Sequence, residues 1–183
     1  MLAYLFWHQP ADEVDQAGYE EALLAFHDRL RAVKVPGLVT SASASVEGLP
    51  WIPGTGYEDS YLVEDFAALG TLNAAAVDDA HAGAHDRVAH TAGFGAGALY
   101  GLDSGDPLRA GSFCAWVTKP AGVNYAQFRE QLTHHTPPTA VAVWRRQMVL
   151  GPSPEFRVTS DHPFVLPGEL SAVTCRAGVV VSQ

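Results

Sequence analysis

The feature that most constrains the fold of this chain is a strand that occurs twice with the same ending. The first occurrence is the apolar and aromatic segment 2–8, which is followed by Pro10, and the second is "SFCAWVTKP" (112–120). Each carries a tryptophan, Trp7 or Trp116, a few residues before the proline. Proline ends a strand because it cannot donate a ladder hydrogen bond. The repeat predicts a chain of two related halves and a structural role for the tryptophan.

The first half has the order strand, helix, strand, strand, helix, strand. Apolar residues recur at helical spacing between about 17 and 33, with charged residues on the opposite side, which predicts an amphipathic helix. Alternation and turn residues predict the strands. After this helix we expect strands in 37–48 and 56–66, an Ala-rich helical stretch 65–91 interrupted by Gly70 and Gly83, and a strand in 95–102.

The second half repeats this order up to its last helix. The helix after the strand 112–120 pairs Tyr125 with Leu132, seven positions apart, as Tyr19 and Phe26 are paired in the first half. Further strands are expected in 139–151, 155–160 and 172–181. About ten residues that include prolines, 161–170, stand where a second long helix would be. The second half is therefore predicted to lack that helix.

A βαββαβ unit folds into an antiparallel sheet with both helices on one face, so two units can pack sheet to sheet. The chain resembles the dimeric α+β barrel superfamily, which has the ferredoxin-like fold, with the two halves (1–106 and 107–183) fused. We expect an α+β protein forming an intrachain barrel, as one compact unit. The resemblance implies many possible functions: cofactor-free antibiotic-biosynthesis monooxygenases, muconolactone isomerases, EthD-like and stress-responsive A/B barrel proteins, and haem-binding enzymes such as haem-degrading enzymes and chlorite dismutases.

The charge and the cysteine content limit which partners and which cellular environment we expect. The net charge is -9, and two of the eleven cations are lysines, Lys34 and Lys119. Nucleic acid and anionic membranes are therefore not expected partners, because phosphate binding needs clustered cations. No signal peptide or apolar run of membrane-spanning length is visible, so a cytoplasmic protein is expected. Cys114 and Cys175 lack CxxC spacing and are expected to be free, buried thiols.

The candidate catalytic residues are His8, Asp59 and Tyr61. Positions 57, 59 and 61 share one face of their strand, and in the ferredoxin-like order this third strand neighbours the first. Histidine, with an ordinary pKa near about 6.5, can serve as a base, while Tyr61 or Asp59 orients substrate or stabilises charge. His8 has no counterpart in the second half, where Val117 follows Trp116.

These residues favour a protein that binds an apolar or aromatic metabolite in a barrel cavity, either as a binding protein or as a cofactor-independent enzyme of monooxygenase or isomerase type. The expected lining residues are Trp7, Trp51, Tyr57, Trp144 and Arg145. The alternative is that the tyrosines are core residues and His8 is a hydrogen-bonded strand end. The protein would then be a non-catalytic scaffold or a dimerisation module, and both a monomer and a homodimer are compatible with the sequence.

A third alternative is a metal or haem site. Asp78, His81 and His85 are spaced three and four residues apart, so on a helix they share a face, as two histidines and a carboxylate binding a metal would. His85 is also the first candidate for a haem ligand. Such residues are usually solvated on an acidic, Ala-rich helix, and Gly83 weakens the helix between them. We therefore expect no cofactor, with haem or a divalent metal as alternatives.

Overall fold

The computed structural model describes residues 1–183 except 79–81, 110, 149–150 and 183. Its strands form a closed barrel in the order β1-β3-β2-β8-β5-β7-β6-β4, with antiparallel neighbours. The elements are β1 (Leu2–Pro10), α1 (Gln16–Val33), β2 (Leu38–Glu47), β3 (Thr55–Val63), α2 (Phe66–Ala76), α3 (Ala82–Thr91), β4 (Ala92–Gly105), β5 (Phe113–Val117), α4 (Tyr125–His135), β6 (Ala140–Arg146), β7 (Phe156–Ser160) and β8 (Ala172–Ser182).

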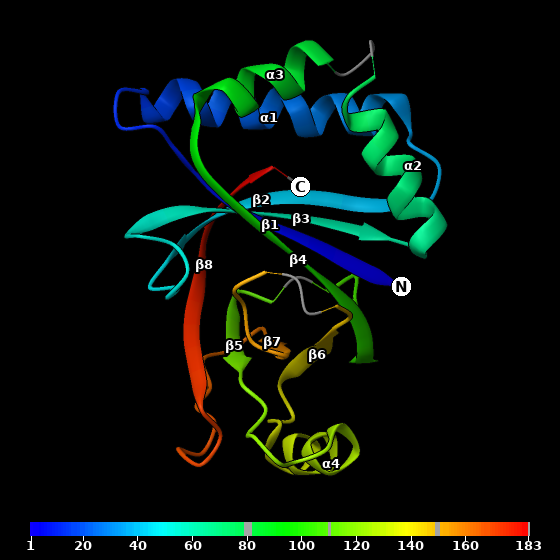
Figure 1. The fold of residues 1–183 in the computed structure, drawn as a ribbon, viewed down its shortest axis with the longest axis vertical. Coiled ribbons are helices and arrows are strands. Elements are labelled where there is room, and N and C mark those ends of the chain that lie inside the picture. Colours follow the sequence, from blue (N-terminus) through cyan, green and yellow to red (C-terminus); the bar gives the residue numbers. More distant parts are fainter. Residues whose placement is uncertain (79–81, 110, 149–150, 183) are drawn as a thin grey trace.

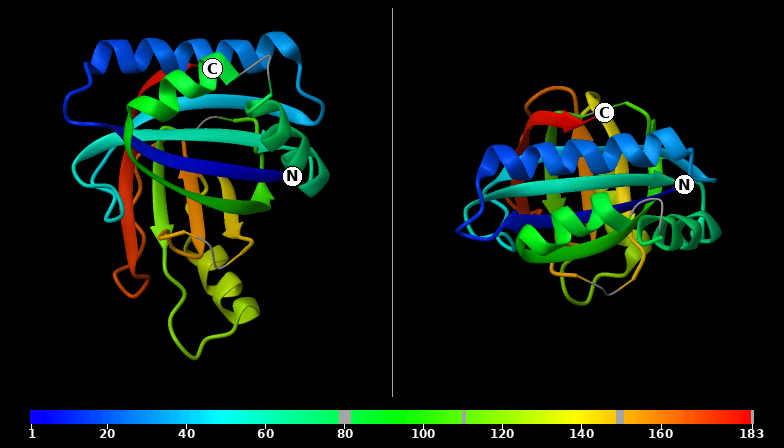
Figure 2. Two further views of the ribbon diagram at one scale, coloured as in Figure 1. Left: turned by 45° about the horizontal axis from the view of Figure 1, so that its top comes forward. Right: turned by 90° about the horizontal axis from the view of Figure 1, so that it is seen from above.

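The barrel consists of two half-sheets with the same internal order. The first is β4-β1-β3-β2 and the second is β8-β5-β7-β6, which is the ferredoxin-like arrangement in both. The β2–β8 and β4–β6 pairs join them into one barrel. Figures 1 and 2 show α1, α2 and α3 over the outer face of the first half-sheet and α4 at the far end of the molecule. The predicted fused α+β barrel is confirmed.

No second long helix lies between β7 and β8, as predicted. Between β7 and β8 the chain is irregular and holds Pro163 and Pro167. Leu166 and Leu170 from this segment join the cluster through which Phe128 and Leu132 of α4 pack against the second half-sheet. The irregular segment therefore covers apolar surface that a helix would otherwise cover.

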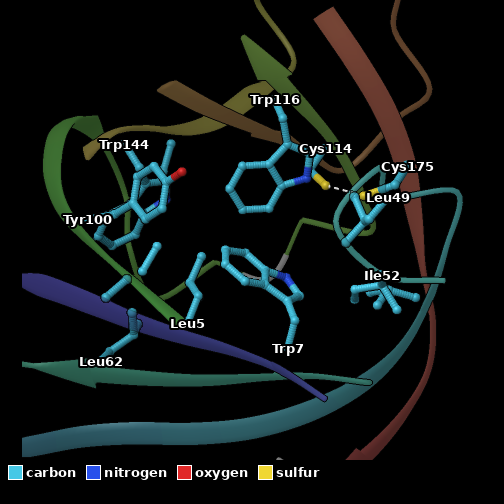
Figure 3. Packing of buried hydrophobic residues seen from close by; sticks show 14 residues of the cluster. Leu5, Trp7, Leu49, Ile52, Leu62, Tyr100, Cys114, Trp116, Trp144 and Cys175 are labelled. Atoms are coloured by element: carbon cyan, nitrogen blue, oxygen red, sulfur yellow. Dashed lines mark hydrogen bonds between the residues drawn. The ribbon is translucent and has the colours of Figure 1, made fainter. Parts of the chain in front are cut away.

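Tryptophans fill the barrel interior (Figure 3). Trp7 and Trp116, which the sequence repeat equates, meet edge to face with ring centroids 5.4 Å apart, and Trp51 lies 5.3 Å from each. A buried ion pair lies among these rings: Arg157 donates to Glu58 at 2.6 Å, and the Trp7 indole donates to the same carboxylate at 2.9 Å. Trp7 thus belongs to the core packing of the barrel.

The helical stretch predicted over 65–91 is divided into α2 and α3. The break follows Ala76, and Gly70 lies within α2, where a helix tolerates glycine at a modest cost. α3 lies alongside α1 (Figure 1), whose N-terminus is capped by the Asp15 side chain. None of the helices in the described part of the chain is long and apolar enough to cross a membrane.

Candidate active site

A cavity lies outside the barrel wall, between the first half-sheet and its helices. Its volume is about 850 Å³. Phe66 and Val77 line it and are 59% and 60% exposed, so they lie at its mouth. The lining comprises Tyr4, Phe6, Tyr19, Phe26, Asp59, Tyr61, Phe66, Leu69, Gly70, Leu72, Asn73, Ala76, Val77, His85, Val88, Ala89, Ala92, Gly93, Phe94 and Gly95. A volume of this size accommodates an ordinary small molecule.

Small residues on β4 make room for the aromatic floor of this cavity. In the sequence "GFGAG" (93–97), a Cβ atom at Gly95 would lie 2.7 Å from Cζ of Phe6, and one at Gly97 would lie 3.0 Å from the hydroxyl of Tyr4. A side chain at either position would displace these rings. The glycine pattern is therefore explained by the close approach of two aromatic side chains.

A buried carboxylate lies at the polar end of the cavity. Asp59 is 3% exposed, and its Oδ1 atom lies 3.3 Å from Nε2 of His8 and 3.4 Å from Nε2 of His27. Both contacts are within ion-pair distance but are not aligned as hydrogen bonds. The Tyr61 hydroxyl donates to Oδ2 of the same carboxylate at 3.0 Å. Three side chains from β1, α1 and β3 thus converge on Asp59.

A tyrosine of the cavity lining, itself 1% exposed, contacts this group. Nδ1 of His8 is 2.7 Å from the hydroxyl of Tyr19, which lines the cavity. A carboxylate only accepts, so the proton of neutral His8 is best placed on Nε2, facing Asp59. His8 Nδ1 then accepts from Tyr19. His8 itself is 1% exposed and does not line the cavity; Tyr19 and Asp59 link it to that space.

The environment keeps Asp59 ionised. Burial by itself would raise the pKa of Asp59, but the imidazoles of His27 and His8 outweigh it and hold that pKa below its usual range. Burial raises the pKa of Tyr61 well above its usual value, and the charge of Asp59 raises it further. At neutral pH the site therefore presents a carboxylate anion and a neutral phenol that donates to it.

The other tyrosines of this face are also held neutral. Burial, followed by the Asp59 charge, raises the pKa of Tyr19 and of Tyr4. Burial and the hydrogen bond to Glu20 raise the pKa of Tyr57 to about 12. These phenols can donate hydrogen bonds to a ligand or pass a proton, but they carry no charge of their own near neutral pH.

The structure brings the three candidate catalytic residues together. The β1–β3 register places His8 opposite Tyr57 and Phe6 opposite Asp59, so His8, Asp59 and Tyr61 share the helix-covered face of the sheet. Tyr57 stacks on His8 with ring centroids 5.7 Å apart and donates to Glu20, but it does not line the cavity. The strand alternation read from the sequence thus places these side chains on one face.

The other expected lining residues lie elsewhere. Trp7, Trp51 and Trp144 belong to the barrel interior, on the opposite side of the sheet from the cavity. Arg145 is in the second half, with its guanidinium 5.8 Å from the ring centroid of Tyr125 on α4. None of them is among the cavity residues. The expectation of a ligand cavity inside the barrel is thus not met in the described part of the chain: side chains fill the interior, and the described cavity lies on the helix-covered face.

Two site residues were missed in the sequence. Tyr19 and His27 both lie on the buried face of α1, eight positions apart, and both reach the Asp59 group. The available signal was a histidine at a position where helical spacing predicts an apolar residue. Such a histidine reveals its partner only when the sheet beneath the helix is known.

The metal candidates are only partly described. His81 lies outside the described residues. His85 lines the cavity, with its ring 5.9 Å from that of Phe26 and Nδ1 3.3 Å from Asp86, and Asp78 follows α2. Within the residues that the structure describes, no group of three or more His, Cys, Asp and Glu side chains is arranged to hold a metal ion.

Comparison with known proteins supports the fold. No protein-family model matches the sequence, and no curated protein matches it significantly. A Fusobacterium nucleatum protein described as a "putative monooxygenase" aligns with TM-score 0.54 and 11% identity, over 87% of this chain and 74% of its own. A protein from Lactobacillus acidophilus with the same description aligns with TM-score 0.51 and 9% identity, over 98% and 94%.

A dimeric protein of unknown function with a ferredoxin-like fold, from Bacteroides fragilis, aligns with TM-score 0.41 and 11% identity, over 54% of this chain and 92% of its own. At such low identities the structural alignments concern the fold and not the chemistry. The alignments above 0.5 cover most of this chain, in agreement with the strand order of its barrel. The chain thus has a ferredoxin-like architecture of the α+β barrel type.

Proposed function

We propose that this protein binds an apolar or aromatic small molecule in the cavity between the first half-sheet and α1 to α3, and removes a proton from it without a cofactor. The observation that carries this proposal is the Asp59 carboxylate, which is buried beside two imidazoles and belongs to the lining of an apolar cavity. Charged groups are rarely buried unless they are paired or functional. The fold shared with proteins described as monooxygenases is compatible with this chemistry.

Tyr19, His8 and Asp59 form the path for the proton. An acidic O–H or C–H group of the ligand gives its proton to the Tyr19 oxygen while Tyr19 passes its own proton to Nδ1 of His8, across the 2.7 Å contact. The imidazolium formed on His8 faces the Asp59 carboxylate, which stabilises the new charge. Tyr61 holds the other oxygen of Asp59 in place.

The fate of the ligand anion separates the two reaction types. Return of the proton to a different ligand atom is an isomerisation. Electron transfer from the anion to dioxygen begins an oxygenation, and the apolar lining limits competition from water. In both reactions the first chemical step is the same proton transfer, so a single assay tests it.

We would use 4-nitrophenol as the probe, because its neutral and anionic forms absorb at different wavelengths. At about pH 6 the neutral form dominates in water. We expect the wild-type protein to bind the probe and to raise the fraction of the phenolate form. Tyr19→Phe removes one hydroxyl and keeps the ring, so we expect binding within about threefold of wild type and loss of the added phenolate.

Tyr57→Phe is the matched control, since it removes a phenol hydroxyl that bonds Glu20 and lies off the cavity. It should leave both probe binding and phenolate formation unchanged. Binding without any phenolate in the wild-type protein would instead indicate a non-catalytic binding protein. Failure to bind 4-nitrophenol and larger planar phenols would favour the scaffold or dimerisation module.

The cofactor and assembly alternatives have separate readouts. Haem bound through His85, which lies on the cavity wall, would give a Soret absorption band in protein purified from cells. A resident divalent metal would appear at a stoichiometric level in elemental analysis. Sedimentation equilibrium distinguishes a monomer from a homodimer, and neither state alters the proton path, which one chain supplies.

A further inference from the structure

Cys114 and Cys175 are directly opposite each other in the β5–β8 ladder. Opposite residues in an antiparallel pair have Cα atoms about 4.5–5.5 Å apart, within the range of about 4.4–6.8 Å that a disulfide spans. Their sulfur atoms are 2.6 Å apart, and both side chains point into the barrel interior (Figure 3). A covalent bond between them needs no movement of the strands.

The surroundings give the two thiols different pKa values. A hydrogen bond joins the two sulfurs, and with Cys114 as its donor it lowers the pKa of Cys175 against the opposing effect of burial. The same hydrogen bond and burial raise the pKa of Cys114 well above its usual value. The positive charge of Arg157 lowers the pKa of both thiols, whereas the negative charge of Glu58 raises both and exceeds the effect of Arg157 at Cys175. Cys175 is therefore the better nucleophile of the pair.

Both thiols are largely buried. Cys114 is 5% exposed and Cys175 is 9% exposed, and the side chains of Leu49 and Ile52 lie beside them (Figure 3). This packing leaves no room for a bulky reagent, so we expect only a molecule of the size of a peroxide to reach the sulfurs, by displacing the loop that carries Leu49 and Ile52. The oxidant that fits the site is accordingly small and uncharged.

We propose that Cys114 and Cys175 are a redox-modification site, at which hydrogen peroxide converts the dithiol into a disulfide that joins β5 to β8. In the first step the Cys175 sulfur attacks one peroxide oxygen, the O–O bond breaks, and the other oxygen leaves as hydroxide, which takes up the proton lost by the Cys175 thiol and becomes water. In the second step the Cys114 sulfur attacks the sulfenic sulfur, and the S–O bond breaks. Water leaves with the Cys114 proton.

The balance is complete: the two thiols lose two electrons, the peroxide gains them, and two waters form. The bond would close a long segment of chain, since the two cysteines are 61 residues apart. It would also fix β8, the strand through which the second half-sheet pairs with β2 across irregular register. The oxidised protein is therefore expected to melt about 5–10 °C higher than the reduced protein.

The test is to treat reduced, native, full-length protein with hydrogen peroxide, denature it, alkylate free thiols and measure the intact mass. We expect loss of two hydrogens, no alkyl adducts, reversal by dithiothreitol and the rise in Tm. In Cys114→Ser, which keeps the nucleophile and removes its partner, dimedone added together with the denaturant after the peroxide treatment should trap a sulfenic acid on Cys175. Persistence of two alkylated thiols at high peroxide would overturn the proposal.

The double variant Cys114→Ala/Cys175→Ala is the control, and its melting temperature should not respond to peroxide. A disulfide formed only between molecules would also contradict the proposal, because the geometry pairs the two sulfurs within one barrel. The mass measurement on the wild-type chain needs no variant, so it decides the matter even if a substitution impairs folding. None of these readouts depends on the proposed cavity chemistry.

Discussion

The substitution Asp59→Asn tests whether the buried carboxylate is ionised and paired. Asn keeps the shape of the side chain and an acceptor oxygen, but it removes the charge that faces His8 at 3.3 Å and His27 at 3.4 Å. Asn leaves His8, His27 and the Tyr61 hydroxyl without their anionic acceptor, and since each buried group that loses its partner costs about 1 kcal/mol or more, we expect a total of about 3–5 kcal/mol. For a domain of this size that loss lowers Tm by about 6–20 °C at pH 7.

The pH dependence gives a second, independent criterion. The pKa of Asp59 is lower in the folded protein than its unfolded value of about 3.9. The unfolded chain then binds more protons, so stability rises with pH through this interval. The contribution is fully present above the unfolded pKa and is lost as pH falls through the folded pKa. The gap in Tm between wild type and Asp59→Asn should therefore be constant from pH 7 to about pH 5 and narrow below about pH 4.

The assay is thermal unfolding followed by circular dichroism at several pH values. Asp28→Asn is the control, because Asp28 is an exposed carboxylate of α1 paired with Arg31, and its loss should cost less than about 1 kcal/mol. A variant Asp59→Asn that melts within about 2 °C of wild type at pH 7 would refute the reasoning. A gap that stays constant down to pH 3 would show that the carboxylate does not carry the effect.

Two further substitutions test the packing around the site and in the barrel. Gly95→Ala should destabilise the protein by about 1–3 kcal/mol and weaken 4-nitrophenol binding, because the added Cβ would lie 2.7 Å from Cζ of Phe6. Gly83→Ala is the control, because a Cβ at Gly83 meets open space, and it should leave binding unchanged. Equal effects of the two substitutions would contradict this explanation. Glu58→Gln should cost about 3–5 kcal/mol in urea unfolding because it leaves the charge of Arg157 buried and unpaired, whereas a loss below 1 kcal/mol would show that the pair is not needed.

Much of the fold could be predicted from the sequence because the patterns that indicate it are local. Strand alternation assigned Tyr4, Phe6 and His8 to one face of β1 and Leu5 and Trp7 to the other, and the structure places these two sets on opposite sides of the sheet. The same alternation of side chains placed positions 57, 59 and 61 on one face of β3. The repeated element order then predicted which strands are neighbours. The prolines of 161–170 predicted that no second long helix forms in the second half.

The site needed more than local signals. That Tyr19 and His27 meet the sheet at Asp59 depends on where α1 rests, which side-chain packing sets. The space beside Asp59 depends on the break between α2 and α3 and on Phe6 lying against Gly95 of another strand. The pairing of Cys114 with Cys175 depends on the register of β5 with β8.

The sequence by itself therefore determined the order of the elements, the face on which each strand residue lies, and the barrel that two such halves build. These follow from periodicity and chain connectivity, which act over a few residues or through the order of segments. Only the tertiary structure decided that the cavity lies under the helices, that two imidazoles share one carboxylate, and that two distant cysteines touch. Those contacts join residues far apart in the chain, and their positions are fixed by how the layers pack.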